Sequence, residues 1–136
     1  MNKTFKLRMS ERCFRFKPDA LPGHAPRQPG VYEFVTFDAK MKPEVLYVGV
    51  AAPGAGETIF DALGQHLMGN RRPTTEDLFK AAKDVYFDFV AEWDGDAEDL
   101  KDIAAALVAK HKPRLNPSSP HATTGRYATV TLEEVG

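Results

Sequence analysis

Residues 51–58 have the sequence AAPGAGET, which is close to a phosphate-binding loop. In such a loop the backbone N–H groups cradle the phosphates of a nucleotide, and a lysine before the closing threonine neutralises their charge. Glu57 stands at the lysine position, and Ala51 stands at the position of the first glycine. Because a carboxylate repels a polyphosphate, we interpret this stretch as a connector that leads into a helix rather than as a nucleotide site.

Four short motifs surround this connector in a fixed order along the chain. They are Pro29-Gly30-Val31-Tyr32, Leu46-Tyr47-Val48-Gly49, Gln65-His66 and Lys112-Pro113-Arg114-Leu115-Asn116. Together they resemble the GIY-YIG nuclease family, which includes the N-terminal domain of the bacterial excision-repair endonuclease. GVY and YVG stand for the two triplets of the family name, and KPRLN is similar to the closing KPxxN motif. The resemblance covers about residues 29 to 117.

Members of this family hydrolyse DNA phosphodiesters with one divalent metal ion. The reaction needs a base for water, a cation for the charge that develops on the phosphate, and a ligand that holds the metal. The resemblance implies that Tyr32 and Tyr47 occupy the positions of the motif tyrosines. One would help to activate the nucleophile, and the other would line the same face. Asn116 matches the closing asparagine of the family.

Two further positions depart from the family pattern. The family arginine lies four residues before the position that matches His66, and this chain has Ala62 there. The metal-binding glutamate lies twelve residues before the closing asparagine, and this chain has Ala104 there. The resemblance therefore implies that the catalytic cation and the metal ligand are both missing. Arg71 and Arg72 come after the first helix, so they reach the site only if the backbone takes a changed path.

The acidic residues near Ala104 do not replace the missing glutamate. Each residue turns a helix by ~100°, so Asp99 and Asp102 lie far from the direction of Ala104 and are expected to face water. Ala104 itself falls within the apolar stripe of its helix, together with Leu100, Ile103, Leu107 and Val108. The spacing of the histidines and the cysteine does not match a zinc site. The sequence therefore predicts no metal site.

The elements that position these residues follow from hydrophobic periodicity. Residues 31–37 and 45–50 are rich in β-branched and aromatic side chains, so they predict an antiparallel hairpin across the turn formers of residues 38–44. The rest of the pattern predicts a helix from residue 59 capped by Thr58 or Gly56, a short helix capped by Thr74 or Thr75, a strand at residues 85–93, a helix ended by Pro113, and a closing strand at residues 127–135.

The N-terminal segment alternates apolar and basic residues, which predicts two short strands or an extended arm with a basic outer face. Residues 1–17 carry six basic residues and one acid, for a charge of +5, whereas the whole chain carries −1. A connector rich in proline and glycine follows and is expected to lack regular structure. We predict an α+β fold with a small central antiparallel sheet flanked by helices. Its parts are a basic extension and connector at 1–28, a GIY-YIG-like domain at 29–117, and a C-terminal loop and strand at 118–136.

Composition limits the cellular setting. The single cysteine, Cys13, excludes an internal disulfide and suits a reducing compartment. The N-terminal segment has no continuous apolar run, so we expect neither a signal peptide nor a membrane span. We therefore expect a cytoplasmic protein that has no membrane partner. The net charge of −1 also argues against strong nucleic-acid binding by the whole surface.

Our favoured hypothesis is a GIY-YIG-like domain that has lost metal-dependent cleavage, needs no cofactor, and binds either a nucleic acid (DNA or RNA) or a protein. The candidate nucleic-acid contacts are Lys6, Arg8, Arg12, Arg15, His66 and Arg114. His66 is expected either at the surface of the helix end or in contact with a phosphate. The alternative is an active endonuclease that uses Mg²⁺ or Mn²⁺ with relocated groups such as Glu57 and Arg114. A third hypothesis is an interaction domain unconnected with DNA, which the acidic residues between 76 and 102 favour.

Overall fold

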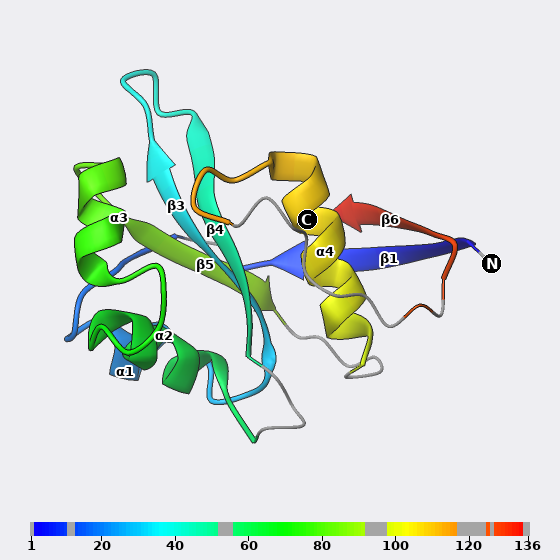
Figure 1. Ribbon diagram of the computed structural model, residues 1–136, viewed down its shortest axis with the longest axis horizontal. Helices are drawn as coiled ribbons and strands as arrows, with labels where there is room; N and C mark the ends of the chain where they lie inside the picture. The colour runs from blue at the N-terminus through cyan, green and yellow to red at the C-terminus, as the bar shows by residue number, and fades with distance from the viewer. Residues whose placement is uncertain are drawn as a thin grey trace.

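One mixed sheet runs through the molecule (Figure 1), whose computed structural model describes residues 2–10, 13–51, 56–91, 98–116, 125 and 127–134. The strand order is β4 (Pro43–Ala51), β3 (Gly30–Phe37), β5 (Tyr86–Ala91), β1 (Asn2–Met9) and β6 (Thr129–Glu134), and the short β2 (Phe14–Arg15) also pairs with β5. The strand pairs are antiparallel except β1 with β6, which is parallel. The predicted α+β class and the mainly antiparallel sheet are therefore confirmed.

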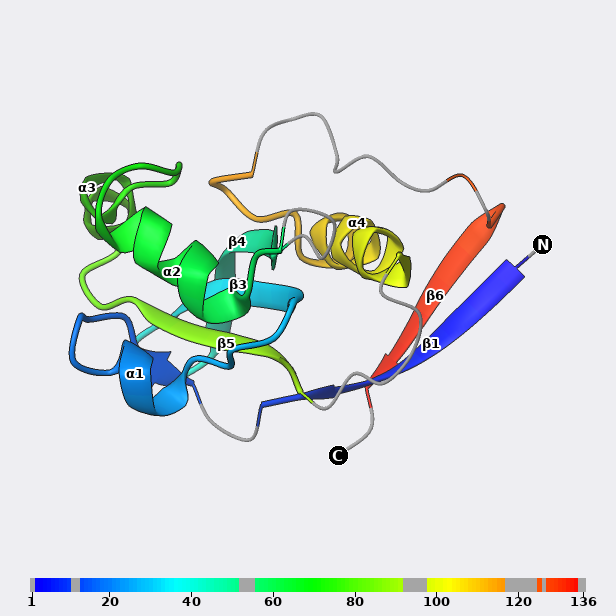
Figure 2. The same ribbon diagram turned by 90° about the horizontal axis from the view of Figure 1, so that it is seen from below.

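The described helices are α1 (Leu21–His24), α2 (Ile59–Leu67), α3 (Thr75–Ala81) and α4 (Asp99–His111). Figures 1 and 2 show α1, α2 and α3 grouped at one end of the molecule, whereas α4 lies beside β4 and β6. The hydroxyl oxygens of Thr58 and Thr74 accept hydrogen bonds from the backbone three residues on, so these residues cap α2 and α3 as the sequence predicts. No helix in the described part of the chain is long and apolar enough to cross a membrane.

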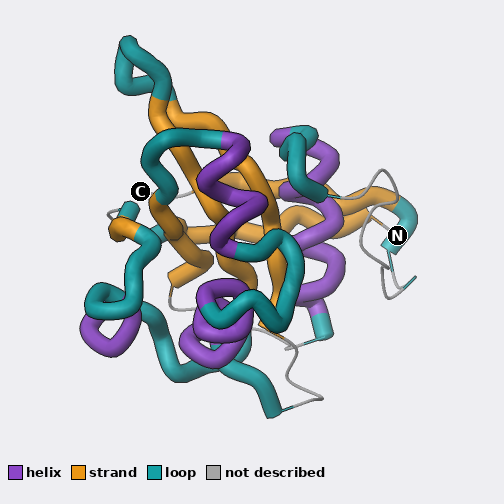
Figure 3. The backbone as a smooth tube through the Cα atoms, turned by 60° about the vertical axis from the view of Figure 1, so that its left-hand side comes forward, coloured by secondary structure: helices purple, strands orange, loops and turns teal. Residues whose placement is uncertain are grey.

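The predicted hairpin is formed by β3 and β4, and Figure 3 shows its turn projecting beyond the rest of the fold. The carboxylate of Asp38 accepts hydrogen bonds from the backbone N–H groups of Lys40 and Lys42, at 2.8 and 2.9 Å, and this closes the turn. Met41 lies between them with 72% of its surface exposed. The hairpin is thus held by its ladder and by one aspartate rather than by packing at its tip.

The N-terminal strand is an inner strand of the sheet. β1 lies between β5 and β6, and its side chains Phe5 and Leu7 are buried. The connector that follows was expected to be irregular, but it contains the short helix α1, so that expectation is wrong. Pro22 fits the first turn of a helix, and the buried Leu21 anchors this turn to the core.

Apolar side chains pack on both faces of the sheet in two separate clusters. The α2-side core contains Tyr32, Phe34 and Phe87 from the strands with Ile59, Ala62, Leu63 and Leu78 from α2 and α3. The α4-side core contains Phe5, Leu7, Val31, Val48 and Val90 from the strands with Leu100, Ile103, Ala104 and Leu107 from α4. The apolar stripe predicted for the last helix is therefore confirmed, and it packs on the face of β3 and β4 opposite to α2.

Asp99 and Asp102 do not face water, so that expectation is wrong. Their exposed fractions are 6% and 2%. The hydroxyl of Tyr127 donates a hydrogen bond to Asp99 Oδ1 at 2.9 Å. The expectation considered only the sheet as a packing partner of α4, whereas Tyr127, which precedes β6, contacts the first turn of the helix. Both acids lie in the first turn of α4, where the helix dipole favours negative charge.

One close contact ties β3 to β4. Tyr32 and Gly49 lie directly opposite each other in the ladder, and the Tyr32 ring crosses over the glycine. A Cβ atom at residue 49 would overlap the ring and its hydroxyl oxygen. Glycine is therefore required here because the neighbouring strand must leave room for the fully buried Tyr32.

We predict that Gly49→Ala lowers the free energy of unfolding by roughly 1–3 kcal/mol, because the added methyl group must displace the Tyr32 ring. Gly64→Ala in α2 is the matched control. Nothing lies within 4 Å of a Cβ atom at that position, so this change should stabilise the helix by about 0.5–1 kcal/mol. Urea unfolding of both variants tests the opposite signs, and equal effects would contradict the proposed overlap.

Candidate functional site

A β-bulge in β4 sets the direction of Tyr47. Phe34 pairs with Tyr47 and Val35 pairs with Val45, so Leu46 is an extra residue in the ladder. Leu46 and Tyr47 therefore both contact the α2-side core, although they are neighbours in a strand. The Tyr47 ring lies 6.1 Å from the ring of Phe34 and 5.6 Å from that of His66. The regular alternation assumed for this strand does not reveal the bulge.

Tyr32, His66 and Pro73 form a buried line of hydrogen bonds. The hydroxyl oxygen of Tyr32 is 2.7 Å from His66 Nε2, and His66 Nδ1 is 2.9 Å from the carbonyl oxygen of Pro73. A carbonyl oxygen only accepts, so Nδ1 carries the proton, and Nε2 accepts from the tyrosine hydroxyl. The expected surface position of His66 is wrong, because none of its surface is exposed. It does not reach a phosphate in this arrangement.

Burial keeps both members of this pair neutral. It lowers the pKa of His66 to about 4 and raises the pKa of the Tyr32 phenol far above its ordinary value, although the charge of Arg71 opposes that rise. Tyr32 therefore holds its proton firmly in the bond to His66. A phenol that is fully buried and protonated has neither the exposure nor the charge to activate a water molecule.

Arg71 comes close to the two tyrosines after all, because the chain turns back at Gly69 (φ +81°) beyond α2. Its Nη2 donates to the carbonyl oxygen of Val50 at the edge of β4 (2.9 Å), and its Nη1 lies 2.8 Å from Glu57 Oε1. Burial raises the pKa of Tyr47, and the positive charge of Arg71 opposes that rise. No local sequence pattern indicates this placement, since it depends on the path between α2 and α3.

Asn116 clamps the turn after α4 to the outer edge of β4. Its Oδ1 accepts from the backbone N–H of Val48 at 2.9 Å, and its Nδ2 donates to the carbonyl oxygen of Val48 at 3.0 Å. The backbone N–H of Leu115 donates to the carbonyl oxygen of Leu46. Both polar atoms of the Asn116 side chain are therefore occupied by the sheet, and the residue closes an edge strand.

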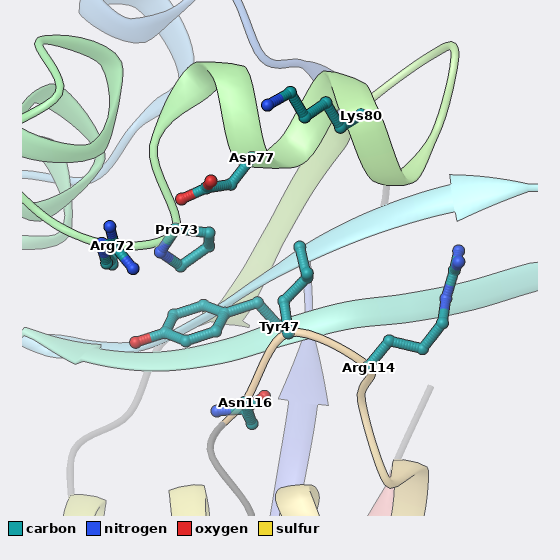
Figure 4. Close-up of a pocket in the computed structure, with 8 residues that line it drawn as sticks. Tyr47, Arg72, Pro73, Asp77, Lys80, Arg114 and Asn116 are labelled. Atoms are coloured by element: carbon teal, nitrogen blue, oxygen red, sulfur yellow. The ribbon is translucent and has the colours of Figure 1, made fainter.

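An open cleft of about 560 Å³ lies beside Tyr47 (Figure 4). Its lining residues are Tyr47, Arg72, Pro73, Asp77, Lys80, Arg114, Leu115 and Asn116. Figure 4 shows the Tyr47 ring between Pro73 and Asn116, with α3 above it. The cleft thus joins β4, the loop before α3, α3 itself and the turn after α4.

The charged side chains of the cleft differ in the hydrogen bonds and ion pairs that they already form. Asp77 caps α3 and accepts from the backbone N–H of Thr74 at 2.9 Å. Arg114 forms two hydrogen bonds to Glu44, from Nε (2.7 Å) and Nη2 (3.2 Å). Lys80 pairs with Glu76 in an exposed i,i+4 pair, which holds it weakly. Arg72 has no ion pair with any described residue.

The basic residues predicted as nucleic-acid contacts do not form one surface. Lys6 and Arg8 are exposed and alternate with the buried Leu7, so they lie on the sheet face opposite to α4. Arg15 lies on the other face, because its neighbour Phe14 packs against Phe87 in the α2-side core. The expectation of one shared face is wrong for Arg15. Arg12 lies outside the described residues.

The two positions that depart from the family pattern lie on opposite faces of the sheet. Ala62 packs in the α2-side core with Tyr32, whereas Ala104 packs in the α4-side core with Val31. A glutamate at position 104 would therefore point away from Tyr32. The described residues contain no group of three potential metal ligands, and Glu57 is engaged by Arg71.

A buried acid pair lies on the α4 side of the sheet. Glu33 and Asp88 are opposite each other on β3 and β5, and Glu33 is 3% exposed. Burial and the neighbouring Asp88 raise the pKa of Glu33 well above its ordinary range. Cys13 Sγ lies 3.9 Å from Asp88 Oδ2, and His111 Nε2 lies 3.6 Å from Glu33 Oε2. The only sequence signal was a glutamate inside an otherwise apolar strand.

Comparisons with known proteins assign no family. No protein-family model, no curated protein and no solved structure matches the chain. The resemblance to GIY-YIG nucleases therefore rests on the sequence motifs alone.

We predict that His66 makes the fold sensitive to acid. Its pKa is about 4 when folded and 6.5 ordinarily, so the unfolded chain binds the proton first as the pH falls through this window. Stability present above pH 6.5 should thus be lost towards pH 4, by up to about 3 kcal/mol. His66→Gln should reduce this loss in urea titrations at pH 7 and 4.5. The exposed His24→Gln is the control, and an equal reduction there would contradict the assignment.

Glu33 should act in the opposite direction. Its pKa is raised in the folded state, so the folded protein keeps a proton that the unfolded chain releases. The stability that Glu33 contributes is therefore fully present at pH values below the ordinary carboxyl pKa and is lost as the pH rises. We expect the free energy of unfolding of Glu33→Gln, relative to that of the wild type, to be higher at pH 9 than at pH 5 by more than about 1 kcal/mol. The control is Glu133→Gln, which changes an exposed carboxyl on β6. A gain independent of pH would show that Glu33 is not held protonated.

Proposed function

We propose that this protein is a GIY-YIG-like nucleic-acid-binding module that does not cleave its ligand. The observation that carries the proposal is the open cleft beside Tyr47. It gathers Arg72, Lys80 and Arg114, and the one acid among its lining residues, Asp77, caps a helix. Cationic side chains and hydroxyl donors are the groups that contact phosphodiester backbones.

The size of the cleft favours a single strand. Its volume of about 560 Å³ falls in the range of sites that hold small ligands, roughly 300–1,000 Å³. Such a space suits one or two nucleotide units. The hydroxyl of Tyr47 forms no hydrogen bond with a described residue, so it can donate one to a phosphate oxygen.

Several features support binding without cleavage. Tyr32 is fully buried and donates to His66, and alanines stand at both positions where the family has its cation and metal ligand. Glu57, the relocated metal ligand of the alternative hypothesis, belongs to no group of three potential metal ligands among the described residues. Losing one such electrostatic group commonly slows an enzyme by a factor of ~10²–10³.

We predict salt-sensitive binding of fluorescein-labelled 12-nucleotide single-stranded DNA or RNA, measured by fluorescence anisotropy from 20 to 200 mM NaCl. The double variant Arg72→Gln/Lys80→Gln should lose on the order of tenfold in affinity, with the salt slope reduced by about one per lost contact. Supercoiled plasmid should not be nicked by the wild type in Mg²⁺ or Mn²⁺.

The matched control is Lys3→Gln/Lys6→Gln, which removes the same charge from exposed positions on β1. An equal loss from both double variants would contradict the cleft as the binding surface. Absence of binding at 20 mM NaCl would overturn the proposal and leave a protein partner as the function. Metal-dependent nicking that Tyr32→Phe abolishes would show an active nuclease.

A further inference from the structure

The outer edge of β4 extends the cleft towards Arg71. Tyr47 and Asn116 lie at the cleft, and Val50, three residues after Tyr47, accepts the hydrogen bond from Arg71. At ~3.3 Å per strand residue, the distance from Tyr47 to Val50 is ~10 Å. This span exceeds the size of one phosphate group. Two arginines therefore lie side by side along the edge of β4. Arg72 lies in the cleft, and Arg71 lies beyond it.

The two arginines differ in their ion-pair partners. Arg72 has no ion pair with any described residue, whereas Arg71 is bound to Glu57 at 2.8 Å. The side chains of this pair keep 29% and 25% of their surface exposed, so solvent and solutes reach both partners. Arg71 is also anchored to the sheet by Val50, so the loop does not depend on Glu57 for its attachment.

We propose that Glu57 occupies the guanidinium of Arg71 in place of a ligand phosphate, so that the protein restrains its own nucleic-acid site until a backbone phosphate displaces the carboxylate. Carboxylates and phosphates offer arginine the same acceptor geometry, which makes them direct competitors for one guanidinium. Glu57 immediately precedes Thr58, the residue that caps α2, so its backbone position is fixed by the helix start while its side chain can rotate away.

The sequence supports the same interpretation. The stretch that ends in Glu57 resembles a phosphate-binding loop with its charge reversed, and the structure shows which cation that reversed charge meets. A carboxylate at this place repels a phosphate directly and also neutralises the nearest arginine. Both effects lower affinity without blocking the cleft beside Tyr47.

This inference rests on the proposed function, and the same anisotropy assay with the 12-nucleotide single-stranded DNA tests it. Glu57→Gln should raise the affinity about fivefold at 50 mM NaCl, since partly exposed ion pairs are weak competitors. The control Glu133→Gln makes the same change of charge and shape at an exposed position on β6. The gain of Glu57→Gln should exceed that of the control.

A double-mutant cycle with Arg71→Met identifies the competitor. In the Arg71→Met background, Glu57→Gln should give no more gain than Glu133→Gln, because the contested cation is gone. Arg71→Lys is the second variant should Arg71→Met unfold, as judged by thermal melts. It keeps the charge but not the paired donors, so the gain should shrink without vanishing.

The outcomes separate the two proposals. Binding by the wild type with equal gains from Glu57→Gln and Glu133→Gln would overturn the restraint and leave the binding function standing. Binding by the wild type together with a larger gain from Glu57→Gln than from Glu133→Gln would support both. Absence of binding by the wild type and by Glu57→Gln at 20 mM NaCl would overturn both.

Discussion

The arrangement of the site depends on the Tyr32 ring lying over Gly49. A buried phenol needs a hydrogen-bond partner because an unsatisfied buried polar group costs about 1–3 kcal/mol. His66 supplies that partner, and its other nitrogen is satisfied by the carbonyl oxygen of Pro73. β3, β4, α2 and the loop before α3 are thereby joined through one line of groups. The loop that this line fixes carries Arg71 and Arg72, so a packing requirement in the core determines where two cations lie at the surface.

Several residues of the family motifs are accounted for by the sheet alone. β4 is an edge strand, and exposed strand edges invite pairing with other chains. Leu115, Asn116 and Arg71 occupy backbone groups of Leu46, Val48 and Val50 along this edge. Gly49 makes room for Tyr32. These contacts are physical reasons for the residues that do not involve catalysis, so their presence is not evidence of cleavage.

The sequence was sufficient to predict those elements whose structure follows from local pattern. The hairpin, the two capped helices, the third strand and the apolar stripe of α4 all follow from periodicity and capping chemistry. It was insufficient to predict contacts that depend on a segment distant in the sequence. Asp99 is hydrogen-bonded by Tyr127, Arg71 is hydrogen-bonded to the edge of β4, and the pairing of Glu33 with Asp88 requires the register of β3 on β5. The bulge at Leu46 is likewise set by cross-strand pairing. Tyr32, Tyr47 and Asn116 were singled out from the motifs, but the residues that they contact were not predicted.

The distribution of charge shows why composition alone is a poor guide to binding in this protein. The basic N-terminal segment suggested one positive surface, but strand alternation divides it, because Leu7 faces the α4-side core and Phe14 faces the α2-side core. Lys6 and Arg15 consequently lie on different faces of the sheet. Cations gather instead at the cleft, where residues from three separate segments meet. Screening limits charge effects to about 8–10 Å at physiological salt, so the affinity for a phosphate depends on this local group and on the acids that neutralise it, and the net charge of −1 has little bearing on it.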